Sequence, residues 1–279
     1  MNFLSFEEKL IPLDEWVQEF VNWLVLNYRD IFQAIKTPIE LCLKGFEWFF
    51  TFLHPAVVIV LFAFLAWRFV GKKTTVFTIV TLLLIGYLGL WEETMITLAM
   101  VISSVFFCAL VGIPLGIMSG RSDRFELFLR PALDAMQTIP PFVYLVPVVM
   151  LFSIGTVSGI LATIVFALPP IVRLTSLGIR QVHPELIEAA LAFGATPWQV
   201  LRKVQFPLAL PSIMAGLNQT LMMALSMVVI AALIGAGGLG NPVVQGLNTL
   251  EIGLATIGGL AIVLLAMMLD RITQGFAKK

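Results

Sequence analysis

The chain has 279 residues, of which 59% are apolar and 12% are charged, and its 17 basic residues balance its 17 acidic ones. Soluble domains have about 45 to 50% apolar and about 25% charged residues, so this composition is typical of an integral membrane protein. The basic residues are scattered, which leaves nucleic acid no surface to bind. Cys42, Cys108, His54 and His183 lack the spacing of metal ligands, so we expect no zinc or iron site.

The first 47 residues contain no apolar run long enough to cross a bilayer, and their start lacks the pattern of a cleavable signal peptide. Six apolar residues fall largely on one helical face: Trp16, Phe20, Trp23, Leu24, Ile31 and Ile35. We therefore predict an amphipathic helix over residues 14–35. The pattern leaves open whether this helix lies in the outer membrane interface or packs on the transmembrane bundle.

Uncharged runs predict the membrane spans, because a bilayer core about 30 Å thick requires about 20 helical residues. Seven spans are expected, at residues 48–67, 74–91, 94–120, 135–154, 157–179, 208–234 and 252–269. Residues 235–251, rich in Gly and Asn, are expected to form an outer loop. The chain thus divides into an interfacial segment, 1–47, and a transmembrane domain, 48–279, with a cytoplasmic loop at 180–207.

Basic residues follow alternate spans. Twelve of them lie after the first, third, fifth and seventh spans: Arg68, Lys72, Lys73, Arg121, Arg124, Arg130, Arg180, Arg202, Lys203, Arg271, Lys278 and Lys279. The other loops contain none. Because cytoplasmic loops are enriched in Lys and Arg, we expect the C-terminus in the cytoplasm and the N-terminus outside.

The loop at 180–207 contains the signals of two short helices. Pro184 suits a first helical position and Gly194 suits a left-handed helix end, which predicts a helix over 184–193. Thr196, Pro197 and Gln199 have the spacing of a capping box, which predicts a second helix over 197–205, stopped by Pro207.

The composition of this hairpin suits docking to another protein. Ala189, Ala190 and Ala192 offer a small-residue surface, while Trp198 and Phe206 offer bulky apolar anchors. An ordinary connecting loop that packs on its own bundle would fit the same residues equally well.

A resemblance favours docking. Glu188-Ala189-Ala190, then Gly194, then Val204-Gln205-Phe206-Pro207 resembles the EAA loop, EAA-x3-G-x9-I-x-L-P, of permease subunits in ATP-driven (ABC) importers. Val204 and Phe206 depart from the pattern conservatively. In that family the loop contacts the ATPase subunit. The resemblance implies an ATPase-coupling site made of Glu185, Glu188, Ala189, Ala190, Gly194, Thr196, Pro197 and Trp198.

The similarity extends over about residues 55–275. Four segments are similar to the glycine betaine and proline betaine (osmoprotectant) permease branch: 136–155, 168–196, 218–240 and 269–274. This resemblance implies an all-α, type I ABC importer (MetI-like) fold in the cell membrane. It also implies a homodimer that works with two ATPase subunits and an extracellular substrate-binding protein. Choline, proline, an amino acid or taurine remain open as substrates.

Two nucleotide-binding motifs fail on inspection. GKKTT at 71–75 lacks the upstream glycine of a P-loop, so ATP and Mg are expected on the partner ATPase and no cofactor on this chain. GAGGLG at 235–240 satisfies the dinucleotide fingerprint but follows a membrane helix instead of a strand, so we expect an outer turn that contributes to the external gate.

Other activities lack their residues. No GxSxG or HExxH motif is present, which argues against a membrane-embedded enzyme. After residue 47 every Asp and Glu falls at or near a predicted loop, which argues against an ion-coupled secondary transporter.

Polar, aromatic and irregular residues inside the predicted spans are candidates for a translocation path. These are Gln137, Pro140, Pro141, Phe142, Tyr144, Asn218, Met222 and Ser226, with Met223 and Met227 beside them. Phe142 and Tyr144 could meet a quaternary ammonium through their ring faces. Each of these residues could equally serve packing or helix kinking.

Two further features concern packing. Arg173 is the one charge inside a predicted span, about 10 Å from the cytoplasmic boundary at 1.5 Å per residue, so an interfacial or intersubunit role is expected for it. Gly112 and Gly116 form a GxxxG pattern, which permits close helix packing and is compatible with a dimer seam.

Overall fold

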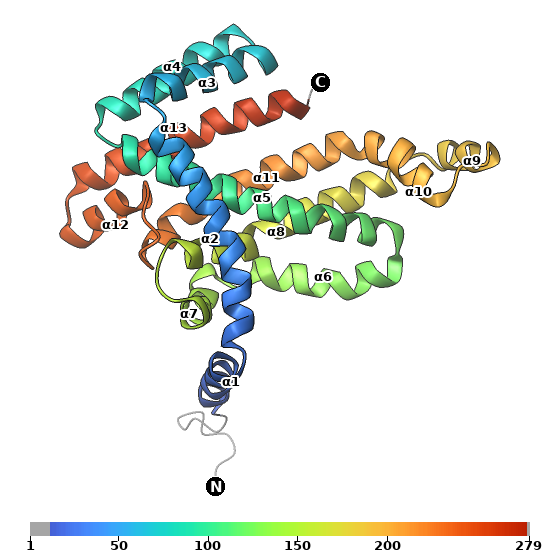
Figure 1. Cartoon of the computed structure of the whole chain (residues 1–279), viewed down its shortest axis with the longest axis horizontal. Helices are drawn as coiled ribbons and strands as arrows, with labels where there is room; N and C mark the ends of the chain where they lie inside the picture. The colour runs from blue at the N-terminus through green and yellow to red at the C-terminus, as the bar shows by residue number, and fades with distance from the viewer. Residues whose placement is uncertain (1–11, 278–279) are drawn as a thin grey trace, which may run out of the picture.

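The computed structural model describes residues 12–277, which are helical nearly throughout. The helices are α1 (Leu13–Asn27), α2 (Arg29–Phe52), α3 (Pro55–Phe69), α4 (Lys72–Tyr87), α5 (Trp91–Arg121), α6 (Asp123–Thr138), α7 (Pro141–Phe152), α8 (Thr156–Arg180), α9 (Pro184–Ala192), α10 (Pro197–Val200), α11 (Phe206–Ala232), α12 (Gly240–Thr249) and α13 (Ile252–Ala277), with a π-helical turn, η1 (Leu201–Gln205), between α10 and α11. The long helices run side by side, and α9 and α10 project from one end (Figure 1).

The core forms where α8 packs between α5 and α11. Glycines allow this close approach: a Cβ atom on Gly116 of α5 would lie 2.5 Å from the Thr175 Cβ and 2.7 Å from the Val172 carbonyl oxygen, both on α8. Gly112 meets Ile171 in the same way. The close helix packing expected from the GxxxG pattern is confirmed, and it joins α5 to α8 within one chain instead of lying at a dimer seam.

Four of the predicted spans are confirmed as helices. Residues 94–120, 157–179, 208–234 and 252–269 lie almost entirely within α5, α8, α11 and α13. In the described part of the chain, these four helices are long and apolar enough to cross a membrane, and the number rises to as many as six if each of two bent helix pairs counts as one span. The seven-span count is therefore not established.

The predicted spans 48–67 and 135–154 are broken. The α2–α3 pair bends by 107° before Pro55, and the α6–α7 pair bends by 100° before Pro141. A residue that precedes proline is disfavoured in the helical conformation, so the chain turns at both places. The span expected at 74–91 is α4, which has 16 residues and a length of about 24 Å.

The α6 helix was missed because its charges resemble a loop. It has four acidic and basic residues beyond its first position: Arg124, Glu126, Arg130 and Asp134. It runs antiparallel to α5 and packs on α8. Asp134 therefore lies within a helix, which corrects the expectation that every later carboxylate falls at or near a loop.

The outer loop expected at 235–251 contains a helix, α12. Pro242 occupies its first turn, where the missing N–H is not needed, and Gly246 allows contact with α13. The GAGGLG segment before it forms a turn, as expected. In that turn the Leu239 N–H donates to the Thr97 hydroxyl of α5 at 2.8 Å, so the turn is fastened to the bundle.

The N-terminal amphipathic segment is two helices instead of one. The break falls at Tyr28, between α1 and α2. None of the α1 side chains is buried, whereas α2 buries Ile39, Leu43 and Phe50 against the bundle. Both helices contact α7, while the buried side chains of α2 lie beyond residue 35, so the two alternatives for residues 14–35 stay a prediction. Because α2 is continuous to Phe52, the helix does not end at the predicted boundary at residue 47.

Candidate functional site

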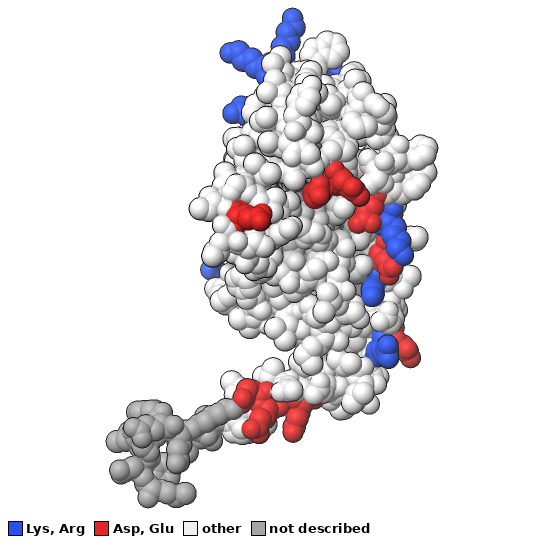
Figure 2. Space-filling model, turned by 90° about the vertical axis from the view of Figure 1, so that its left-hand side faces the viewer, with Lys and Arg blue, Asp and Glu red and all other residues white. Residues whose placement is uncertain are grey.

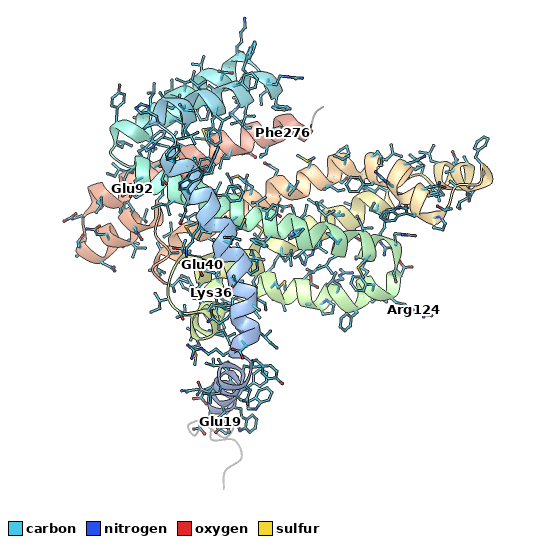
Figure 3. All side chains as sticks on the ribbon, viewed as in Figure 1. Glu19, Lys36, Glu40, Glu92, Arg124 and Phe276 are labelled. Atoms are coloured by element: carbon cyan, nitrogen blue, oxygen red, sulfur yellow. The ribbon has the colours of Figure 1, made fainter. Side chains whose placement is uncertain are left out.

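The hairpin at 180–207 projects beyond the bundle at the end where the basic loops gather (Figure 1). Figure 3 places Glu92, near the start of α5, and Arg124, just after its end, at opposite ends of the molecule. The face in Figure 2 is largely uncharged and carries scattered acidic and basic groups. The loop after α5 therefore lies at the hairpin end and the loop before α5 at the opposite end.

The tip of the hairpin is built as its local chemistry predicted. Gly194 has φ +81°, the Ala195 N–H donates to the Ala190 carbonyl at 3.0 Å, and the Gly194 N–H donates to the Leu191 carbonyl at 2.9 Å. These two bonds form a Schellman motif, which ends α9 and turns the chain back. The two expected helices, 184–193 and 197–205, are confirmed at their starts.

A capping box begins the second helix. The Gln199 N–H donates to the Thr196 hydroxyl at 3.3 Å, and the Thr196 N–H donates to the Gln199 side-chain oxygen at 2.8 Å. Both bonds satisfy amides that have no partner inside the helix. Gly194, Thr196 and Gln199 therefore turn the chain between the two hairpin helices.

Loss of this cap should loosen the hairpin alone. We expect Thr196→Ala to destabilise the start of α10 by about 1 kcal/mol, which makes amide exchange at residues 198–200 about fivefold faster. Hydrogen exchange followed by mass spectrometry measures this. Ser122→Ala, which removes the cap that accepts from the Phe125 N–H, is the control and should affect only α6. Equal effects of both variants on the hairpin would contradict the assignment.

Pro207 does not stop the second helix. From Pro197 to Ala232 the chain forms one helical rod of 36 residues, in which η1 precedes Pro207. Proline lacks an N–H and clashes with the carbonyl one turn earlier, and the wider π turn accommodates it. The hairpin is therefore continuous with α11, which reaches the core.

The residues of the predicted coupling site are mostly exposed. Glu185, Glu188, Ala189, Gly194, Thr196, Pro197 and Trp198 are exposed, and Ala190 is half-buried. Val200 and Leu201 are buried and anchor the base of the hairpin. Phe206, expected as a docking anchor, instead packs on the core of its own chain, while Phe193 is 93% exposed at the tip. The sequence reasoning did not name Phe193 as a docking residue. Its place just before Gly194, which ends the helix, could have indicated that it faces solvent.

A polar cluster joins α6 to α8 near the middle of the chain. The Arg173 guanidinium donates to Asp134 at 2.5 Å and to the Gln137 side-chain oxygen at 2.9 Å. Gln137 in turn lies 3.9 Å from the Met223 sulfur of α11. Two turns further along α8, Arg180 pairs with Asp123 and Glu126, both at 2.6 Å. The charge of Arg173 is thus balanced by Asp134 of the same chain. The structure also brings Arg173 and the candidate path residue Gln137 into contact.

The Arg173–Asp134 pair should behave as a coupled unit. Removal of either charge by Arg173→Gln or Asp134→Asn leaves the other without its partner, so the double variant should be less destabilised than the sum of the two singles. Both side chains are about half exposed, so we expect a coupling of only about 0.5 to 1 kcal/mol. Melting of the detergent-solubilised protein measures it. Strictly additive effects would contradict the pairing.

The candidate path residues divide into two groups on α11. Met222 and Ser226 are exposed, and Gln219, which the sequence reasoning missed, shares their face at helical spacing. Asn218 instead points toward α13, where it donates to Asp270 at 2.8 Å and accepts from Thr273. The structure therefore groups Gln219, Met222, Met223 and Ser226, with Gln137 at their edge, and removes Asn218 from the group. We call this group the α11 polar face.

The two aromatic candidates do not form a joint cage within one chain. Phe142 and Tyr144 lie two residues apart on α7, so their rings leave the helix on different sides. Phe142 is exposed, whereas Tyr144 packs beside Leu145 and Met227 with its hydroxyl buried. Pro140 and Pro141 stand at the sharp α6–α7 bend and serve it.

The long apolar helices define a class: a multi-pass, all-α membrane protein with an exposed helical hairpin. Residues 112–279 match the family described as "Binding-protein-dependent transport system inner membrane component", and the chain belongs to this family.

Relatives support this membership. The glycine betaine/proline betaine transport system permease protein ProW of Escherichia coli (strain K12) is 53% identical over 273 residues, which cover 98% of this chain and 77% of that protein. The glycine betaine/carnitine transport permease protein GbuB of Listeria monocytogenes is 45% identical and covers 96% of both chains. The resemblance to the osmoprotectant permease branch is confirmed.

A solved structure supports the fold. The inward-facing MetNI methionine ABC transporter matches with a TM-score of 0.55 and 30% identity, over 65% of this chain and 89% of that one. The chain therefore has the type I ABC importer permease fold. The match covers most of that neighbour's chain but only 65% of this one, so this chain extends beyond the shared fold.

Proposed function

We propose that this chain is the translocation subunit of an ATP-driven importer for glycine betaine or a related quaternary-amine osmoprotectant. One observation carries the proposal: the exposed hairpin with the EAA residues is continuous, through η1, with the α11 helix that presents the α11 polar face. A push on the hairpin by a partner would therefore tilt or shift the surface that substrate passes.

The proposed assembly contains two copies of this chain, two ATPase subunits and an extracellular substrate-binding protein. ATP and Mg are held by the ATPase, since this chain has no P-loop. The basic end of the bundle, with the hairpin and the C-terminus, lies in the cytoplasm, and the N-terminus lies outside. The small, exposed surface of α9 suits a groove on each ATPase.

The translocation path in this proposal runs beside the α11 polar face. Gln219, Met222 and Ser226 are polar or polarisable side chains that no helix within residues 12–277 covers, which suits a surface completed by the second copy. Because Asp134 neutralises Arg173, the polar cluster presents no unpaired cation to repel a quaternary amine. Phe142 is exposed and available to a cage only if the second copy supplies its other wall.

The substrate is tested by competition. Vesicles that contain this chain, its ATPase and its binding protein should take up labelled glycine betaine, and excess unlabelled glycine betaine should block this uptake while amino acids should not. Both relatives described above carry glycine betaine in their names, which supports the choice of probe. Uptake blocked by proline or another amino acid, but not by glycine betaine, would keep the permease and replace the substrate.

A further inference from the structure

A large apolar groove lies at the base of the hairpin, apart from the α11 polar face. It has a volume of about 910 Å³ and lies between the end of α5, the start of α6 and the α10–α11 rod. Its α5 wall consists of Pro114, Ile117 and Met118, which share one helical face, and its opposite wall includes Trp198 and Phe206. We call it the α5–α10 groove.

The charges at the groove are of one sign. Arg121 and Arg202 line it, and the described residues that form its walls include no acidic side chain. Neither arginine side chain has a hydrogen bond or an ion pair within residues 12–277, although both Arg173 and Arg180 on neighbouring α8 have carboxylate partners. The groove therefore combines apolar walls with two cationic groups that have no counter-ion in this chain.

The groove also lies at the level where the predicted membrane span of α5 ends. Residues 94–120 of α5 are uncharged, and Arg121 is the residue that ends this helix. At such a boundary the hydrocarbon region gives way to the lipid headgroups, where Trp and Arg side chains are favoured. Met118 and Trp198 are both exposed at this level, so the groove opens to the surroundings of the bundle.

From this combination we propose that the α5–α10 groove binds one anionic phospholipid of the cytoplasmic leaflet. The acyl chain lies along the α5 wall, and the headgroup phosphate is held by Arg121 and Arg202. Basic pockets between helices on the cytoplasmic side recognise anionic headgroups through the same chemistry. The cytoplasmic placement of this end rests on the proposed function. A bound lipid contacts both α5 and the base of the hairpin. The lipid composition of the membrane therefore affects the position of the hairpin directly.

The test measures binding without substrate or ATP, so it is independent of transport. The full-length protein, purified from membranes with its partners, is mixed with equal amounts of phosphatidylglycerol and phosphatidylethanolamine and examined by native mass spectrometry. We expect the Arg121→Gln/Arg202→Gln variant to retain about tenfold less phosphatidylglycerol than the wild type. The matched control is Arg124→Gln/Lys203→Gln, which removes two exposed charges of the same region that do not line the groove and should retain the lipid.

Three results would overturn the proposal. The first is a wild-type protein with no preference between the two lipids, and the second is an equal loss in both double variants, which would indicate general surface attraction. The third comes from a photoreactive benzoylphenylalanine in place of Met118: a cross-link to the second copy or to the ATPase, in place of a phospholipid, would assign the groove to a protein partner.

Discussion

Gly194→Val is expected to leave the permease folded in the membrane but to reduce ATP-driven uptake about tenfold or more, while the ATPase activity of the complex continues. Gly194 has φ +81°, and no atom lies within 4 Å of the position that a Cβ would take. A valine at this position therefore meets no steric clash, but the left-handed backbone conformation costs it about 1 to 3 kcal/mol. The chain relieves this strain by adopting a different turn conformation. Uptake and ATP hydrolysis, measured on the same preparation, test it.

Gly89→Val is the matched control. Gly89 has φ +75° and equally open surroundings, but it lies between α4 and α5, at the end of the bundle away from the hairpin. Because Asn tolerates the left-handed conformation, Gly194→Asn should retain more uptake than Gly194→Val. Wild-type uptake in Gly194→Val, or equal uncoupling in Gly89→Val, would show that the shape of the hairpin does not couple the two activities.

Gly116→Val is expected to have the largest effect on folding. A Cβ at this position would lie within 3 Å of both the Thr175 side chain and the Val172 carbonyl, and a backbone carbonyl cannot move without shifting α8. Overpacking of this kind costs about 1 to 3 kcal/mol or more, because rigid groups block relaxation. The amount of protein in the membrane and the melting temperature of the solubilised protein should both fall.

The control for this substitution is Gly259→Val in α13. Gly259 also lies in a helix that is long and apolar enough to cross a membrane, so the change in helix propensity from Gly to Val is the same at both positions. No atom lies within 4 Å of the position of a Cβ on Gly259, so the steric clash is absent there. We expect a near-normal melting temperature. Similar losses in Gly116→Val and Gly259→Val would mean that the α5–α8 contact does not limit stability.

The parts of the fold that local chemistry controls could be predicted from the sequence. The α5, α8, α11 and α13 helices follow from uncharged runs, because nothing else stabilises such runs in a bilayer. The Schellman motif at Gly194 and the capping box at Thr196 follow from residue types at fixed spacing. The exposure of the EAA residues did not follow from these caps, because a loop packed on its own bundle fits the same residues.

The parts that depend on tertiary contacts could not be predicted. The charges of α6 suggested a loop because their partners, Arg173 and Arg180, lie on α8, far away in the sequence. The sequence indicates Asn218 as a path residue, but in the structure its side chain donates to Asp270 on α13. Pro207 resembled a stop because only the structure contains the π turn that precedes it. In each case a contact or a backbone adjustment overrides the local preference.

The central claim is that energy from ATP reaches this chain through the hairpin, and one measurement tests it most directly. Labelled glycine betaine uptake is followed in vesicles that contain this chain with its ATPase and binding protein, with and without ATP inside, and with an ion gradient imposed or abolished. The account predicts uptake that requires ATP and ignores the gradient. Uptake that follows the gradient in the absence of ATP would contradict it.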